Sequence, residues 1–147
     1  MYLDYELHAK LSSTETLGEV KRILLAYPNI SAKLFEKAAS GEPLQDMLHT
    51  EIGGIILIPP NRSKETRAAA VTPYFQTGNV WIKNAPWTNE FISEMVNFPG
   101  SRYDDQVDAA SQAIEYMQRT FGGLQSCDEE QIGIARFIST GRSRRRF

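Results

Sequence analysis

The chain has 147 residues, enough for one domain with its own hydrophobic core. Apolar residues make up 41% of it and charged residues 23%, as in ordinary globular proteins. The single cysteine, Cys127, excludes a disulfide framework and a zinc site built from several cysteines. No apolar run approaches the roughly 20 residues of a membrane span, and residues 1–10 do not resemble a signal peptide. The composition therefore predicts a soluble intracellular protein.

The charge is unevenly distributed. The net formal charge is −2, but the last six residues contain four arginines, and the other 12 basic residues face 18 acidic ones, so residues 1–141 carry −6. An acidic body argues against broad, non-specific coating of nucleic acid. The basic end can neutralise phosphates in a salt-dependent way, or it can be a solvated terminus.

The first predicted elements are a strand, a helix and a second strand. Residues 2–11 alternate apolar and polar side chains without a breaker, which predicts an extended strand. Residues 12–14 offer helix N-caps, apolar residues then recur at helical spacing, and Pro28 stops the run. The short apolar segment 32–36 predicts a buried strand that ends in the acidic Glu36.

The remaining elements continue the alternation. A helix is predicted over residues 44–52, and the clearest core strand of the chain over residues 54–58. A helix capped by Ser63 follows and runs to Gly78.

Three more elements complete the predicted order: a short strand over residues 80–82, a helix between Pro86 and Pro99, and a last helix from Asp104 to Gly122. Strands that alternate with helices predict an α/β fold with a largely parallel sheet. In such sheets, sites lie at the carboxyl ends of the strands, which is where Glu36 stands.

The sharpest chemical feature is a cluster of aspartates at the start of the last helix. Asp104 and Asp108 are four residues apart and Asp105 and Asp108 three apart, so each pair shares a helix face. Clustered carboxylates repel one another unless a cation intervenes, and Mg²⁺ prefers such oxygen ligands. The alternative is that the aspartates only stabilise the helix N-terminus, where free amides and the helix dipole favour negative charge.

Other candidate residues also have two interpretations. Glu36 can share a metal ion with the aspartates, or be an ordinary exposed strand-end glutamate beside Lys37. Lys64 and Arg67 lie on one helical turn and can clamp a phosphate, or form weak surface ion pairs. No glycine-rich phosphate loop occurs in the sequence, so we expect no ATP-driven motor within it.

Several motifs occur together in a specific order. They are Phe35-Glu36 with Gly41, Lys64-x-x-Arg67-Ala68, Pro73-x-Phe75-x-x-Gly78-x-Val80, Pro86-Trp87, Phe91-x-x-Glu94, Phe98-Pro99 and Asp104-Asp105-Gln106-Val107-Asp108-Ala109. Together they resemble the C-terminal nuclease domain of tailed-phage terminase large subunits, over roughly residues 2–120.

The resemblance implies an RNase H-like mixed sheet flanked by helices over residues 1–124, followed by a polar and basic tail over 125–147. It implies endonucleolytic cleavage of double-stranded DNA during genome packaging, in the cytoplasm of a bacterial host cell. The implied cofactor is a pair of Mg²⁺ or Mn²⁺ ions, which activate water and stabilise the leaving oxygen.

The resemblance also assigns residues to roles. The implied catalytic residues are Glu36, Asp105 and Asp108. The implied metal ligands are these three and Asp104, and the implied DNA-binding residues are Lys64 and Arg67. Other packaging proteins are further expected partners, and no association with a membrane is expected.

Three departures from the family pattern matter. Lys37 stands where many relatives have an aspartate, and Tyr103 where many have a histidine. Residues 2–11 resemble the second strand of the fold, so the first strand with its catalytic aspartate is missing, and Asp4 is on the wrong strand to replace it. The sheet then has a gap beside the strand that ends in Glu36. We expect the chain to form homo-oligomers through that edge, to rearrange and close it, or to accept a strand from another polypeptide.

Three hypotheses therefore stand. The chain is an active endonuclease, or a catalytically inactive prophage remnant that serves as a DNA-binding or assembly module or has no function, or an unrelated α/β interaction domain whose aspartates cap a helix. For the unrelated domain we expect Glu36 and the aspartates to lie far apart, whereas the first two hypotheses place the Glu36 carboxylate within about 4–8 Å of them, the span that one or two bridging ions allow. The inactive remnant differs from the active enzyme in its weak metal binding, because the first catalytic acid is missing.

Overall fold

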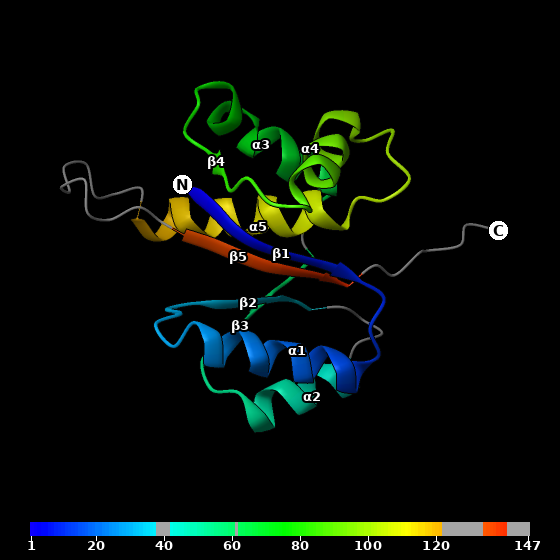
Figure 1. The fold of residues 1–147 in the computed structure, drawn as a ribbon, viewed down its shortest axis with the longest axis vertical. Coiled ribbons are helices and arrows are strands. Elements are labelled where there is room, and N and C mark those ends of the chain that lie inside the picture. Colours follow the sequence, from blue (N-terminus) through cyan, green and yellow to red (C-terminus); the bar gives the residue numbers. More distant parts are fainter. Residues whose placement is uncertain (38–41, 61, 122–133, 141–147) are drawn as a thin grey trace. The chain divides into compact units, whose positions relative to one another are not determined.

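The computed structural model describes residues 1–37, 42–60, 62–121 and 134–140 (Figure 1). The chain divides into two compact units. The first unit comprises Met1–Ala9 and Arg62–Phe147, and the second comprises Lys10–Asn61. Each unit has its own parallel sheet, of three and two strands respectively in the described part of the chain. None of the helices in these ranges has the length and apolar composition that a membrane span requires.

The second unit pairs two strands with two helices. Its elements are α1 (Ser13–Ala26), β2 (Lys33–Glu36), α2 (Glu42–Glu51) and β3 (Ile55–Ile58). β2 and β3 pair in parallel from Lys33 opposite Ile55 to Glu36 opposite Ile58, and α1 and α2 lie on one side of them (Figure 1). Glu36 is the last residue of β2, as predicted, and it is exposed.

A capping box starts α1. The Ser12 hydroxyl accepts the Glu15 backbone N–H at 3.3 Å, and the Glu15 carboxylate accepts the Ser12 backbone N–H at 2.7 Å. These reciprocal bonds satisfy two amides that the helix itself cannot pair. The predicted cap is confirmed.

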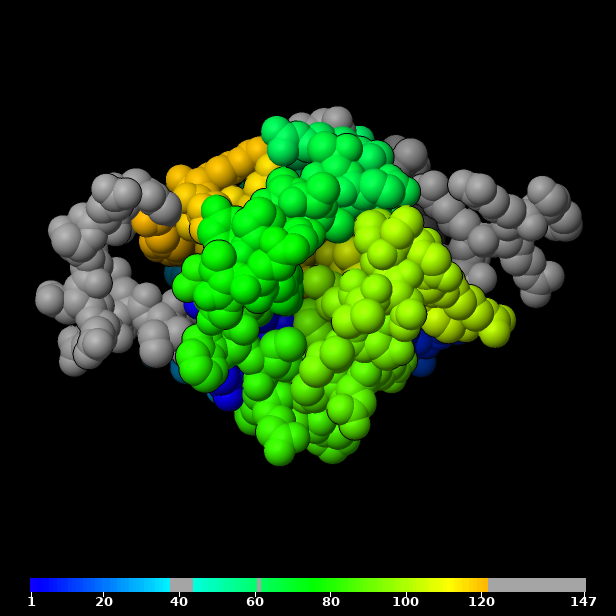
Figure 2. All heavy atoms as spheres, turned by 90° about the horizontal axis from the view of Figure 1, so that it is seen from above, coloured from blue at the N-terminus to red at the C-terminus, as the bar shows by residue number. Residues whose placement is uncertain are grey.

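The first unit contains the other six elements. They are β1 (Tyr2–Ala9), α3 (Lys64–Gln76), β4 (Trp81–Ile82), α4 (Thr88–Asn97), α5 (Asp105–Phe121) and β5 (Ile134–Thr140). β1 is the central strand, with β4 and β5 parallel on either side. Helix α5 contacts β5, α3 and α4, so it lies between the strands and the other two helices (Figure 1). Helices α3 and α4 form the outer face seen in Figure 2.

A bulge in β1 decides which side chains face the helices. The pairing with β5 shifts between Leu3 and Tyr5, so Asp4 is an extra residue on the β1 side. Such a residue reverses the alternation of a strand beyond it. Leu3 and Glu6 are therefore both buried, although an unbroken alternation over three residues would place them on opposite faces.

The hydrophobic core of the first unit joins β1 to α4 and α5. Leu3, Phe91 and Ala110 are buried at its centre, at 0–1% exposure. Half-buried apolar residues pack around them, and the Trp87 ring meets Phe91 edge-on at 6.2 Å between ring centroids. This core fixes α4 against the start of α5, where the aspartates lie.

The predicted order of nine elements from β1 to α5 is confirmed, and the fold is mixed α/β with short parallel sheets. One strand was not predicted. β5 lies inside residues 125–147, which the sequence assigned to a tail, and pairs with β1 over seven register positions. Among the described strands, β2 pairs only with β3.

The position of β5 leads to a test of the β1 edge. Removing residues 122–147 deletes β5 and exposes the hydrogen-bonding edge of β1, and an exposed edge promotes strand pairing between molecules. We expect this truncated chain to have a concentration-dependent mass above that of the full chain in light scattering. Removing only residues 141–147 keeps β5 and should leave the mass unchanged. Equal masses for the two truncated chains would contradict a protective role for β5.

Candidate functional site

The predicted aspartate cluster lies at the start of α5, but its three members have different surroundings. Helix α5 begins at Asp105, and Asp104 precedes it. The backbone carbonyl of Asp104 accepts the Asp108 N–H at 3.0 Å, which closes the first turn. Asp104 and Asp105 are half-buried, whereas Asp108 is buried with its side chain only 9% exposed. The cluster therefore divides into a buried acid and two accessible ones.

Two cations of α3 bind this cluster. The Lys64 ammonium donates to Asp104 at 2.7 Å and lies 3.8 Å from an Asp108 oxygen. The Arg67 guanidinium, which is buried, donates to the other Asp108 oxygen and to the backbone carbonyl of Arg62 at 2.7 Å. The structure thus pairs the two predicted phosphate-binding residues with two of the predicted metal ligands, and it buries Arg67 away from the surface.

These pairs explain the electrostatics of Lys64. Partial burial lowers the pKa of its ammonium, but the hydrogen bond with Asp104 and the nearby carboxylates of Asp108 and Asp105 outweigh that effect. The net result is a raised pKa, so Lys64 stays charged over the whole neutral range. The Lys64 ammonium is therefore a permanent positive charge in direct contact with the aspartate cluster.

Asp105 is the member of the cluster that is not neutralised by direct contact. Its carboxylate has no hydrogen bond or ion pair within the described part of the chain. Burial raises its pKa most; Lys64 and His8 lower it, and Asp104 and Glu94 raise it further. A half-buried carboxylate without a direct cationic partner is the oxygen donor of this cluster best suited to a hard divalent ion.

A glutamate from α4 holds the start of α5. One oxygen of the buried Glu94 carboxylate accepts the backbone N–H groups of Gln106 at 2.7 Å and Val107 at 3.1 Å. Its other oxygen accepts the Gln106 side-chain amide at 2.8 Å. Glu94, and not an aspartate side chain, therefore satisfies these two first-turn amides, which weakens the interpretation that the aspartates serve only as caps.

Glu94 was not among the predicted site residues. Its signal in the sequence is its position three residues after Phe91, next to the apolar face of α4. A carboxylate on the buried side of a helix needs partners, and the nearest available ones are free amides of another helix.

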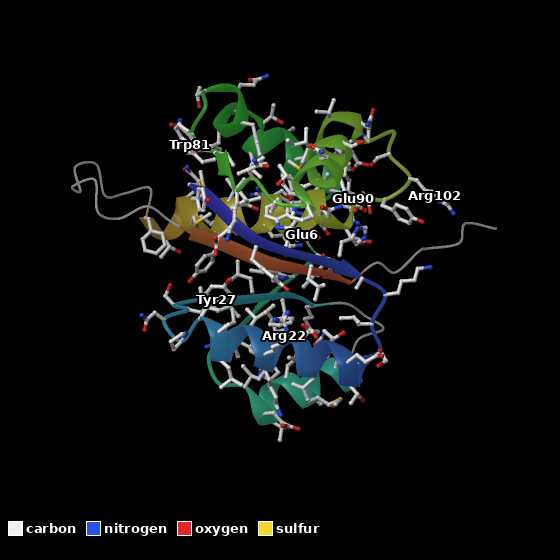
Figure 3. All side chains as sticks on the ribbon, in the orientation of Figure 1. Glu6, Arg22, Tyr27, Trp81, Glu90 and Arg102 are labelled. Carbon is white, nitrogen blue, oxygen red and sulfur yellow. The ribbon has the colours of Figure 1, made fainter. Side chains whose placement is uncertain are left out.

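A cluster of polar side chains connects Glu94 to strand β1. The Gln106 side-chain amide also lies 3.3 Å from His8 Nδ1, which is 3.2 Å from the Glu90 carboxylate. Glu6 and Glu90 lie on the same side of β1 (Figure 3), and the Glu6 Oε1 atom is buried without a hydrogen-bond partner among the described residues. Burial raises the Glu6 pKa to about 7; His8 lowers it, and Glu90 and Glu94 raise it.

The predicted metal ligands do not gather completely within one unit. Glu36 belongs to the second unit, and its convergence with Asp105 stays a prediction. Among the residues that the structure describes, no three His, Cys, Asp or Glu side chains form a group that could hold a metal ion. The first unit supplies oxygen donors of the right chemistry for Mg²⁺ or Mn²⁺, but only part of a ligand set.

The fold is mixed α/β with short parallel sheets and an acidic helix start, which is consistent with an RNase H-like domain. The chain matches the terminase RNaseH-like domain family over residues 2–117, and it belongs to that family. The resemblance inferred from the motifs is confirmed, and the family supports a terminase nuclease-type function. Comparisons with curated proteins and with solved structures found no match.

Burial of Glu6 predicts a pH-dependent stability. The pKa of Glu6 is about 7 in the folded chain, whereas its ordinary value, which applies to the unfolded chain, is 4.5. Folding therefore favours the protonated acid. Below about pH 4.5 the group costs nothing, because both states bind the proton. As the pH rises to 7 the cost grows, and above pH 7 it is full, of order 3 kcal/mol for a shift of about 2.5 pKa units.

We therefore expect Glu6→Gln to stabilise the chain at pH 8, and this gain to vanish near pH 4. Urea unfolding between these pH values measures it. Asp46→Asn, at an exposed position of α2, is the control and should show no such trend. A constant effect of Glu6→Gln at every pH would contradict the buried, protonated Glu6.

Proposed function

We propose that this chain is a metal-dependent endonuclease domain that cleaves double-stranded DNA during phage genome packaging. The observation that carries the proposal is membership of the terminase RNaseH-like family over residues 2–117. The start of α5 supports it, because this turn presents the accessible carboxylate of Asp105 beside the permanent cation Lys64.

The acids would have different roles in this activity. Asp105 and Glu36 would hold Mg²⁺ or Mn²⁺, with Asp104 available as a further donor once Lys64 releases it. The bound ions supply activation of water and stabilisation of the leaving oxygen. Asp108, which Arg67 neutralises, would orient the helix turn and the Lys64 ammonium.

The two basic residues would also differ. Arg67 is 4% exposed and its guanidinium binds Asp108, so it would position that acid and not contact DNA. The Lys64 side chain is 34% exposed and can exchange Asp104 for a phosphate oxygen of the DNA backbone. Of the two basic residues, Lys64 would therefore bind the DNA.

A second function is favoured by the ion pairs themselves. Lys64 and Arg67 already neutralise Asp104 and Asp108, and no complete metal-binding group occurs among the described residues. This arrangement suits a catalytically inactive member of the family that binds DNA or takes part in assembly.

Plasmid nicking separates the two functions. With Mn²⁺ we expect the full chain to nick supercoiled DNA, and Asp105→Asn or Glu36→Gln to lower the rate at least about 100-fold, because each removes a metal ligand. Chelation of the metal should abolish nicking. Nicking by Asp105→Asn at the rate of the unaltered chain would exclude catalysis at this site. DNA binding without nicking or Mn²⁺ binding would support the inactive alternative.

Asp108→Asn should behave differently from Asp105→Asn. It leaves the buried Arg67 guanidinium without its carboxylate, and breaking a buried ion pair in this way costs about 3–5 kcal/mol. Asp105→Asn removes a half-buried charge without a direct partner and should not lower the stability. Urea unfolding of both variants measures the difference, and equal stabilities would contradict the assigned roles.

A further inference from the structure

A single side chain of α4 fixes the turn that carries the candidate metal ligand. Glu94 uses both carboxylate oxygens to bind α5: one accepts two consecutive backbone amides, and the other accepts the Gln106 side chain. The three donors belong to the two residues that directly follow Asp105. Glu94 therefore restrains the first turn of α5 from the side of α4.

The surroundings make this contact rigid. Glu94 is 7% exposed and Gln106 is 1% exposed, so water does not compete strongly for the hydrogen bonds. Hydrogen bonds from backbone amides to an ionised carboxylate are short and strong, and the helix dipole adds to the attraction. Gln106 extends the contact to His8 of β1, which ties α4, α5 and the central strand together at one point.

From this geometry we propose that Glu94 is a positioning residue for Asp105. It holds the first turn of α5 so that the Asp105 carboxylate is oriented for metal binding, while Arg67 and Asp108 hold the same turn from the side of α3. The inference rests on the proposed function, because it concerns the same candidate metal site. Glu94 itself has both oxygens occupied and binds no metal.

Two substitutions separate the geometry of Glu94 from its charge. Glu94→Ala removes all three acceptor contacts. Glu94→Gln keeps one oxygen for the two backbone amides, and its new amide can donate to Gln106 Oε1, which has no partner among the described residues, if the Gln106 amide turns over. Glu94→Gln can therefore preserve the turn, and Glu94→Ala cannot.

The experiment combines three measurements on the full chain. Hydrogen exchange at the Gln106 and Val107 amides reports the turn, Mn²⁺ titration reports the ligand, and plasmid nicking reports the reaction. For Glu94→Ala we expect faster exchange at both amides and a 10–100-fold weaker Mn²⁺ affinity, the usual effect of losing a residue that orients a metal ligand. The nicking rate at fixed Mn²⁺ should fall with it.

Rescue by the conservative variant is the decisive readout. Glu94→Gln should remain within about threefold of the unaltered chain in all three measurements, because the turn keeps its acceptor. Glu90→Gln is the matched control, since Glu90 lies one turn earlier on α4 and contacts His8 but not the α5 backbone. It should change neither exchange nor Mn²⁺ affinity. If Glu94→Ala does not fold, Glu94→Asp replaces it, because the shorter side chain withdraws the carboxylate from the amides.

The outcomes distinguish this inference from the proposed function. If the unaltered chain binds Mn²⁺ and nicks DNA, but a folded Glu94→Ala or Glu94→Asp binds Mn²⁺ equally well, the positioning role is wrong and the nuclease function stands. If the unaltered chain neither binds Mn²⁺ nor nicks DNA, the proposed function fails, and the positioning role fails with it. Weaker Mn²⁺ binding with rescue by glutamine supports both.

Discussion

The first turn of α5 is the constraint on which the site depends. A helix start exposes amides that its own backbone cannot pair, and a buried one must find acceptors elsewhere. Here Glu94 of α4 supplies them, and the buried pair of Arg67 and Asp108 fixes the same turn to α3. The two contacts approach from different helices, so the turn cannot rotate without breaking one of them.

This arrangement gives three neighbouring aspartates three different electrostatic states. Asp108 is buried and paired with a guanidinium, Asp104 shares an accessible ammonium, and Asp105 is left half-buried without a direct partner. Lys64 and Arg67 of α3 therefore relieve part of the repulsion among the acids. The remaining negative charge is concentrated on one side chain, next to a lysine that stays protonated.

Local signals were enough to predict most of the fold. The Ser12 and Ser63 caps, the apolar periodicity and the glycine and proline breakers predicted nine elements in the right order. The strand β5 was missed because its pairing with β1 joins residues more than 130 positions apart, and its apolar stretch lies among polar residues. A single sequence carries little information on such a contact.

The sequence predicted several residues of the site, but not which of them bind one another. The aspartates and the two basic residues of α3 were recognised, yet the pairing of Arg67 with Asp108 spans 41 positions and is not visible as a local pattern. Glu94 was noted only as part of the Phe91-x-x-Glu94 motif, and neither Glu94 nor Glu6 was given a role in the site, because a glutamate is usually solvated. Both are buried here: Glu94 finds amide partners on α5, whereas Glu6 is held in a region where its acid form is favoured.

The bulge at Asp4 gives one short strand two kinds of inward-facing residue. Before the extra residue, β1 contributes a leucine to the apolar core; after it, the same face contributes an acid and an imidazole to the polar contacts near α5. If Asp4 were instead paired regularly with β5, strict alternation over three residues would turn either the leucine or the glutamate outward. The one unpaired residue thus decides whether a single face of the strand serves both the apolar core and the polar contacts of the acidic turn.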